Sequence, residues 1–293
     1  MNSVPDLGMS QFTTLPFSFE NDVELCRNTP LRQLEFCEAK LSRDAGEARR
    51  QLETMRDIGV RPVSFQPRVH SLFPDSMAAS PKEPKERVQE MCNGMDRFAE
   101  VFREPRMPCV VISGVVPKGD VRGGERTFKE LLPGLCDHAA KLGFTLAYET
   151  IHPVLVNNDT FTWKLDDAIA LVDAVGREEL GFVVDTWHVY WEPELAKTLR
   201  SIATRVRVVH LSDHPKEGPR QFLDRLVLGT GAADFPAIFK ALDEGGYKGP
   251  WCIELLSDKS LPDSLWKWSS EELMAENREA FERLWKEAER MKS

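Results

Sequence analysis

The sequence has no apolar run long enough to cross a membrane, and residues 1–10 show no basic stretch followed by an apolar core. Basic residues are in deficit, with 38 Lys and Arg against 47 Asp and Glu and a formal net charge of −9. They also form no cluster, whereas nucleic-acid affinity depends largely on clustered Lys and Arg. We therefore expect a cytoplasmic protein that has neither a nucleic acid nor a membrane as a partner.

Paired cysteines and linkers are also lacking. The six cysteines show no Cys-x-x-Cys pair and no metal-finger spacing, which predicts buried thiols rather than disulfides. No stretch rich in Pro, Ser or Gly divides the 293 residues, a length that is ordinary for one (β/α)₈ barrel. With 42% hydrophobic residues the chain can bury a substantial core. We expect one domain over residues 1–293.

Short apolar runs typical of buried strands alternate along the chain with stretches of helical periodicity. The strands are expected within 9–17, 31–39, 61–66, 109–113, 144–148, 180–184, 206–209 and 250–253. The helices are expected at 18–27, 44–58, 85–102, 126–142, 165–175, 193–203, 235–243 and 270–291. Gly176 should end one helix, and Ser269 with Glu272 forms a capping-box pattern for the last. Parallel strands alternating with helices close most simply into an α/β TIM barrel, whose C-terminal rim carries the functional groups.

Four chemically active residues stand at or just past the ends of the last four predicted strands. They are Glu149, Asp185, His210 and Glu254. Any one of them could belong to a salt bridge, but four on consecutive strands favour a shared role. Three carboxylates and one imidazole form a mixed O/N ligand set for Mn²⁺, Mg²⁺, Co²⁺ or Zn²⁺.

A cation at such a site suits the removal of a proton from a carbon next to a carbonyl group. The cation can hold the charge of the enediolate that forms, through the carbonyl oxygen and a neighbouring hydroxyl oxygen. Glu149 and Glu254, from different sides of the barrel mouth, could face the two sides of a bound sugar and relay the proton. The sequence thus predicts metal-assisted chemistry on a carbonyl compound.

Five segments together resemble the sugar phosphate isomerase/epimerase family of xylose-isomerase-like TIM barrels. The segments are AYETIHP at 147–153, VVDTWHV at 183–189, VHLSD at 209–213, LGTGAADF at 228–235 and CIEL at 252–255. That family includes ketose 3-epimerases, hydroxypyruvate isomerases and inosose isomerases and dehydratases. The resemblance implies that the four residues above bind the metal and that His188 reaches a substrate oxygen. It also implies that Arg225 binds the substrate by forked hydrogen bonds.

Several further residues have two interpretations each. His152 stands where family epimerases often carry another carboxylate, and is either a catalytic general base or a loop histidine. His188 could instead support a ligand carboxylate. His70 and Glu38, near the ends of the third and second predicted strands, are candidate substrate contacts. The turn Gly229-Thr-Gly231 lies where many barrels bind phosphate, so a phosphorylated substrate stays open.

Together these patterns predict an enzyme of carbohydrate metabolism that acts on a small sugar or keto-sugar. The leading hypothesis is a sugar or keto-polyol isomerase or epimerase that uses a metal-stabilised enediolate, with Mn²⁺ as the favoured cation. The alternative is a metal-dependent lyase, a dehydratase or deglycosidase that acts by β-elimination on an oxidised sugar with His152 as the base. A homo-oligomer and a companion subunit are both compatible with the sequence. A zinc nuclease would require more histidines and a basic surface than this chain has.

Overall fold

The computed structural model describes residues 4–220 and 223–291, and within them eight parallel strands form a closed barrel. The strands pair in chain order, and the last pairs with the first through Leu7 and Trp251. They are β1 (Leu7–Ser10), β2 (Gln33–Cys37), β3 (Arg61–Gln66), β4 (Met107–Val111), β5 (Phe144–Glu149), β6 (Leu180–Asp185), β7 (Val206–Leu211) and β8 (Trp251–Ile253). The predicted TIM barrel is confirmed.

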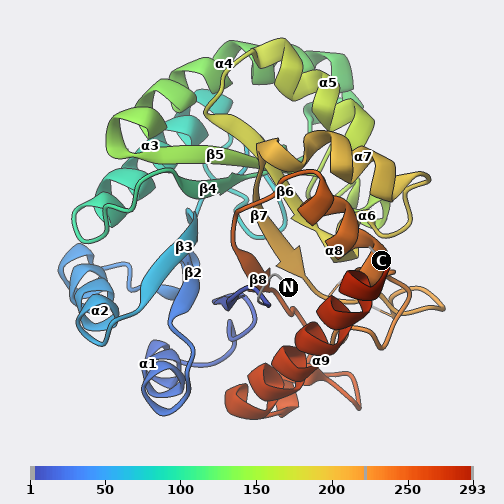
Figure 1. Ribbon diagram of the computed structural model, residues 1–293. Coiled ribbons are helices and arrows are strands. Elements are labelled where there is room, and N and C mark those ends of the chain that lie inside the picture. The colour runs from blue at the N-terminus through green and yellow to red at the C-terminus, as the bar shows by residue number, and fades with distance from the viewer. Residues whose placement is uncertain (1–3, 221–222, 292–293) are drawn as a thin grey trace.

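Helices surround the barrel and follow one another around it in chain order, as the colour sequence in Figure 1 shows. They are α1 (Phe19–Asn28), α2 (Ala45–Asp57), α3 (Pro84–Ala99), α4 (Val121–Leu142), α5 (Leu165–Val175), α7 (Leu195–Ile202), α8 (Phe235–Glu244) and α9 (Ser270–Arg290). A one-turn helix, α6 (Thr186–Val189), starts directly after β6 and was not predicted. Short 3-10 turns are η1 (Glu38–Lys40), η2 (Pro117–Gly119), η3 (Pro153–Leu155), η4 (Ala203–Arg205) and η5 (Leu265–Lys267).

The helix ends follow from local side-chain chemistry. The Ser269 hydroxyl accepts a hydrogen bond from the Glu272 N–H, and the Glu272 carboxylate accepts one from the Ser269 N–H, so the predicted capping box at the start of α9 is confirmed. Gly176 ends α5 in the left-handed conformation, with a φ of 66°, which a residue without a Cβ adopts at little cost. Helix α4 starts five residues earlier than predicted because Asp120 accepts a hydrogen bond from the Gly123 N–H.

Strands β4, β5 and β6 are buried along their whole length, as expected for parallel strands that are covered on both faces. A small apolar cluster belongs to the strands alone and therefore fills the barrel interior. It consists of Val110, Ala147, Val183, Val208 and Cys252. All six cysteines are buried and free of disulfides, which confirms the prediction for them. The core thus forms a rigid support for side chains at the strand ends.

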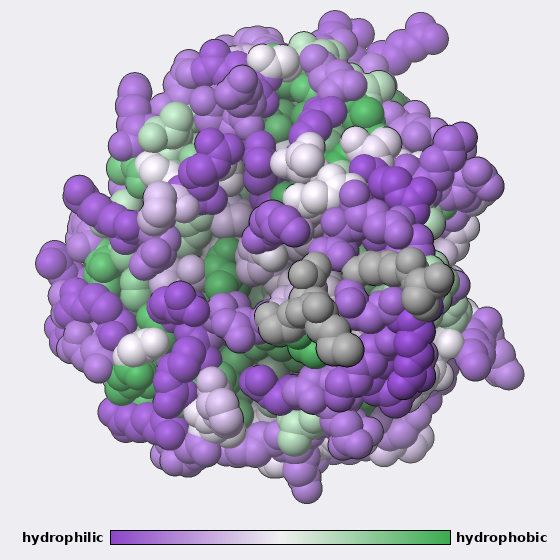
Figure 2. Space-filling view, viewed as in Figure 1, coloured by the Kyte–Doolittle hydropathy of each residue, from purple (hydrophilic) through white to green (hydrophobic). Residues whose placement is uncertain are grey.

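The first strand is shorter than predicted, because residues 11–17 form a series of turns in place of an extended run. In the turns, the N–H groups of Thr13 and Thr14 donate to the carbonyls of Ser10 and Gln11. Polar side chains cover most of the face shown in Figure 2. In the described ranges, no helix has both the length and the apolar character needed to cross a membrane.

Candidate metal centre

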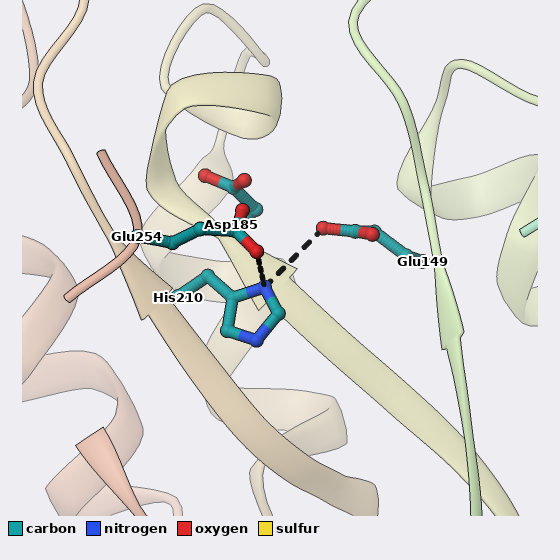
Figure 3. Close-up of side chains that lie close together, drawn as sticks. All are labelled: Glu149, Asp185, His210 and Glu254. Atoms are coloured by element: carbon teal, nitrogen blue, oxygen red, sulfur yellow. Dashed lines mark ion pairs between the residues drawn. The ribbon is translucent and has the colours of Figure 1, made fainter. Parts of the chain in front are cut away.

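The four predicted ligands converge at the C-terminal ends of the last four strands. Glu149 ends β5, Asp185 ends β6, His210 lies near the end of β7, and Glu254 directly follows β8. Figure 3 shows their side chains pointing toward a shared space. One ligand atom from each lies within 4.8 Å of the others, and all four residues are buried. Their meeting is a consequence of parallel strands ending at one rim.

Two polar atoms in this space are buried without a hydrogen-bond partner. They are Nδ1 of His210 and Oε1 of Glu149, which lie 3.5 Å apart. Nδ1 of His210 also lies 3.5 Å from Oε1 of Glu254. A buried polar atom without a partner is costly, so such atoms in a folded protein indicate a missing ligand or ion. A divalent cation would satisfy them, and the O/N ligand set fits one.

Glu35, in the middle of β2, fixes the ring of His210. Its Oε2 lies 2.8 Å from Nε2 of His210, and it also accepts hydrogen bonds from Ser64 at 2.6 Å and Gln66 at 2.8 Å. An ionised carboxylate only accepts hydrogen bonds, so Nε2 carries a proton. Burial lowers the pKa of His210, but Glu254 and Glu35 raise it well above its ordinary value, so without a cation the ring is protonated on Nδ1 as well. A cation bound at Nδ1 would replace that proton and take the lone pair. Burial alone would raise the pKa of Glu35, but His210 and these hydrogen bonds hold it below its ordinary value.

Strands of the first half of the barrel also contact Glu254. Its Oε1 accepts hydrogen bonds from Gln66 of β3 at 3.0 Å and from Ser10 of β1 at 3.4 Å. The candidate ligands therefore come from β5 to β8, whereas groups that orient them come from β1, β2 and β3.

Arg225 lies against two of the ligand carboxylates. Its Nη1 is 2.7 Å from Oδ2 of Asp185 and 3.0 Å from Oε2 of Glu254. Burial lowers the pKa of this guanidinium, but the two carboxylates raise it by more, so the net shift of the pKa is upward. Arg225 is thus fully charged and holds both carboxylates in place.

The carboxylates still exceed the positive charge around them. Burial raises the pKa of Glu149 and raises that of Glu254 to about 8, although His210 and Arg225 act in the opposite direction. The pKa of a carboxyl group rises in this way when its ionised form lacks compensating charge, and a bound cation would lower it again. The raised pKa values of these carboxyl groups and the unpartnered atoms therefore both indicate a site for a cation.

A cavity of about 240 Å³ opens onto this centre. Glu149, Glu254 and Gln66 form part of its wall, and the rest comes from the loops beyond the strands. The segments beyond the strand ends contribute His70, Asp75, Ser76, Asp159, His188 of α6 and Arg225, with apolar side chains such as Phe12, Ile112 and Leu256 between them. The volume is below the roughly 300–1,000 Å³ of pockets for drug-sized ligands, which indicates a small substrate.

Three of the predicted substrate contacts, His70, His188 and Arg225, line this cavity. The backbone N–H of His152 donates to Nδ1 of His188 at 3.1 Å, so the neutral ring carries its proton on Nε2. Nε2 lies 3.5 Å from Oδ2 of Asp185. Burial lowers the pKa of His188 to about 3, so the ring is neutral at physiological pH. His188 can therefore contact a substrate and support Asp185 at the same time.

His152 and Glu38 lie elsewhere. The His152 ring packs beside Tyr190 and His214 and accepts a hydrogen bond from the Val154 N–H, and it is not among the described residues that line the cavity. Glu38 forms an ion pair with Arg97 of α3, because η1 turns its side chain out toward the helices. The structure therefore gives no support to His152 as the base or to Glu38 as a substrate contact.

Three residues of the site, Glu35, Gln66 and Asp159, were not predicted from the sequence. Glu35 did give a signal, because it is a charged residue between Leu34 and Phe36 in an apolar run. Gln66 and Asp159 gave none, since a polar residue at a strand end or in a loop is ordinary.

The family model of the xylose isomerase-like TIM barrel matches residues 22–284. This match covers most of the chain, and the closed barrel agrees with it. The chain therefore belongs to the xylose isomerase-like TIM barrel family.

Curated relatives include isomerases, epimerases and a dehydratase. An inosose isomerase of Bacillus velezensis is 26% identical over 248 residues, 80% of this chain and 86% of that protein. A ketose 3-epimerase of Arthrobacter globiformis is 28% identical over 156 residues, which cover 50% of each protein. An inosose dehydratase of Klebsiella pneumoniae is 30% identical over 117 residues, 34% of this chain and 38% of that protein.

Solved structures share the fold. The structure of the IOLI protein with a bound zinc atom superposes with a TM-score of 0.76 at 20% identity, covering 96% of this chain and 98% of that one. A xylose isomerase-like TIM barrel protein from Mycobacterium smegmatis in complex with magnesium gives a TM-score of 0.66 at 16% identity, covering 96% and 97%.

Proposed function

We propose that this protein is a divalent-metal-dependent isomerase or epimerase of a sugar or keto-polyol. The observation that carries the proposal is the convergence of three carboxylates and one imidazole beside a small cavity, with Nδ1 of His210 and Oε1 of Glu149 buried and unpartnered. The curated relatives that act as isomerases and epimerases support the same reaction class.

Glu149, Asp185, His210 and Glu254 would hold the cation. When bound, it would supply positive charge that stabilises the enediolate oxygens after a proton leaves the carbon beside a carbonyl group. We favour Mn²⁺ because carboxylate oxygens outnumber nitrogen in the ligand set, while the bound zinc and magnesium of similar structures keep those metals as alternatives.

The protein's own groups would move the proton. Glu149 and Glu254 both line the cavity, so each can reach a substrate carbon. One carboxylate would take the proton, and either it or the other would return a proton to the adjacent carbon in isomerisation, while the hydroxyl proton passes from the oxygen of the first carbon to the former carbonyl oxygen. In epimerisation, the second would return it to the same carbon from the opposite face. Arg225 and His188 would orient the ligand carboxylates and the substrate oxygens.

A lyase is the second candidate, and the match to an inosose dehydratase favours it. Its reaction begins with the same proton removal and continues with loss of a hydroxyl group as water. Its base would be a carboxylate of the metal centre or, as predicted from the sequence, His152, whose backbone N–H donates to His188 of the cavity wall. One domain, a cytoplasmic location and a homo-oligomer or companion subunit stay predictions from the sequence.

Incubation of the Mn²⁺-loaded protein with free ketohexoses, ketopentoses and inososes in D₂O tests the proposal. An isomerase or epimerase incorporates deuterium at the carbon next to the carbonyl group and forms a new isomer, which NMR detects. A lyase instead releases a dehydrated product. Full activity after exhaustive chelation would refute the metal dependence, and absence of both exchange and product would refute the reaction class.

A further inference from the structure

Asp159, in the loop between β5 and α5, has one carboxylate oxygen in use and one free. Its Oδ1 accepts hydrogen bonds from the N–H of Ser76 at 2.9 Å and from the hydroxyl of Ser76 at 2.5 Å. Its Oδ2 has no hydrogen-bond partner among residues 4–220 and 223–291, although Asp159 is only 9% exposed and lines the cavity. This oxygen is open to the cavity and can accept a hydrogen bond from a bound ligand.

His70 offers a complementary group in the same cavity wall. It is 6% exposed, and its ring has no hydrogen-bond partner within the described part of the chain. It is near enough to Asp159 to lower the pKa of that carboxyl, which burial raises. A substrate hydroxyl between them could donate to Asp159 and accept from His70, so the pair matches a hydroxyl group.

The loop between β3 and α3, which carries His70 and the Ser76 that binds Asp159, is held firmly. The guanidinium of Arg87 is fully buried, lies 3.3 Å from Oδ2 of Asp75 and donates to the carbonyls of Ser71 and Ala78 at 2.7 and 2.8 Å. Asp75 in turn accepts hydrogen bonds from the N–H groups of residues 77 and 78. The segment that seats Asp159 is therefore preorganised, which lowers the entropic cost of binding.

The cavity has no free cation for a phosphate group. Arg225 is the single Lys or Arg among the described residues of the cavity wall, and Asp185 and Glu254 already neutralise it. Asp159 adds negative charge on the loop side, whereas the charge of Asp75 is balanced by Arg87. A phosphate monoester carries a charge of about −1.5 to −2 at pH 7, so it would meet like charge there.

The glycine turn after β7 is occupied by a carboxylate of the protein itself. The N–H groups of Gly231 and Ala233 donate to Asp213 at 2.7 and 3.0 Å, and the N–H of Ala232 donates to the carbonyl of His214 at 2.9 Å. The N–H of Thr230 donates to a backbone carbonyl at 3.3 Å. The N–H groups of residues 230–233 are thus already used by the protein, which weakens the sequence argument for a phosphate site at 229–231.

We propose that Asp159 and His70 form a subsite for a hydroxyl group of an unphosphorylated polyol substrate, at the end away from the metal centre, and that the cavity discriminates against sugar phosphates. This inference rests on the proposed function and names its substrate class. His70 and Asp159 lie beyond the ends of β3 and β5, so the subsite is on the outer side of the candidate ligands.

The test compares paired substrates in the D₂O exchange assay with Mn²⁺-loaded protein. The pairs are D-fructose with D-fructose 6-phosphate, and D-ribulose with D-ribulose 5-phosphate. We expect kcat/KM for the free sugar to exceed that for the phosphate by about 10- to 100-fold, the range for loss of a hydrogen bond to a charged group. Equal rates, or a preference for the phosphate, would overturn the inference.

Three variants separate recognition from loop structure. Asp159→Asn should lower kcat/KM for the free sugar by about 10- to 100-fold, with metal content unchanged. The ratio of kcat/KM for the free sugar to kcat/KM for the sugar phosphate should therefore become smaller. Ser76→Ala removes only the hydroxyl donor to Oδ1, keeps the backbone N–H donor and leaves Oδ2 intact, so it should narrow this ratio less than Asp159→Asn does. Asp167→Asn, the same change at an exposed position on α5, should match the wild type. An unchanged ratio in Asp159→Asn would contradict the assignment.

Absence of exchange with either substrate class would count against the proposed function, and a binding experiment then judges the subsite alone. Calorimetry measures the affinity of D-glucitol for the metal-loaded wild type and for Asp159→Asn. The subsite predicts binding that weakens by about tenfold or more in the variant. No binding, or equal binding, overturns it.

Discussion

Replacing Glu35 by glutamine should weaken metal binding although Glu35 is not a ligand. The carboxylate accepts hydrogen bonds from His210, Ser64 and Gln66, all in the barrel interior. A glutamine amide has a single acceptor oxygen, so its NH₂ group must face at least one of these donors. The imidazole of His210 would lose both its fixed orientation and the negative charge that makes Nδ1 a better donor to a cation.

Loss of such a supporting contact typically costs about 10- to 100-fold in metal affinity, which corresponds to about 1.4–2.7 kcal/mol. Competition with a chromophoric chelator measures the dissociation constant of Mn²⁺ directly. Glu276→Gln, at an exposed position of α9, is the matched control and should bind as the wild type does. Wild-type affinity in Glu35→Gln would refute the view that β2 orients the His210 ring.

Three further predictions concern the metal, the pH dependence and the rim loop. Glu254→Gln should abolish turnover and release the metal on dialysis while circular dichroism stays unchanged; full metal occupancy would exclude it as a ligand. Burial and His214 lower the pKa of His152 to about 4, so the unfolded chain gains a proton as the pH falls below about 6.5 and the folded protein does not. The free energy of unfolding therefore decreases as the pH falls from about 6.5 to about 4. In His152→Asn this decrease, measured by urea unfolding, should be smaller than in the wild type by about 1–2 kcal/mol, a value reduced because the ring is half-exposed. An equal decrease in the variant and the wild type would contradict this. Arg87→Met leaves Asp75 buried without its partner and should lower the free energy of unfolding by about 3–5 kcal/mol; a loss below about 1 kcal/mol would show that the pair contributes little.

The barrel could be predicted because each buried strand stands as a short apolar run between helical patterns. Strand β3 matches its predicted range of 61–66, and most other elements differ by only a few residues. The first strand was too long in the prediction, since residues 11–17 form turns although Phe12, Leu15 and Phe17 are apolar. Helix α6 was missed because one helical turn has no periodicity to recognise.

The convergence of the four candidate ligands could be predicted because strand ends in a parallel barrel meet at one rim, which sequence order alone determines. Side-chain direction is a different matter, since η1 turns Glu38 outward and the turn after β5 places His152 against Tyr190 and His214. The pairing of Ser76 with Asp159 joins loops 83 residues apart in the chain, and no local pattern indicates such a contact.

The seam between β1 and β8 would make binding of the proposed cation a reporter of barrel closure. Ser10 and Glu35 come from the first strands, yet they orient Glu254 and His210 from the last ones. Any opening of the seam separates these pairs, so a loosened barrel must bind the cation more weakly. By thermodynamic linkage the cation then stabilises the closed form, and saturating Mn²⁺ at 100 times its dissociation constant should add about 2.7 kcal/mol to global stability. The ion would thus stabilise the pairing between the first and the last strand of the sheet.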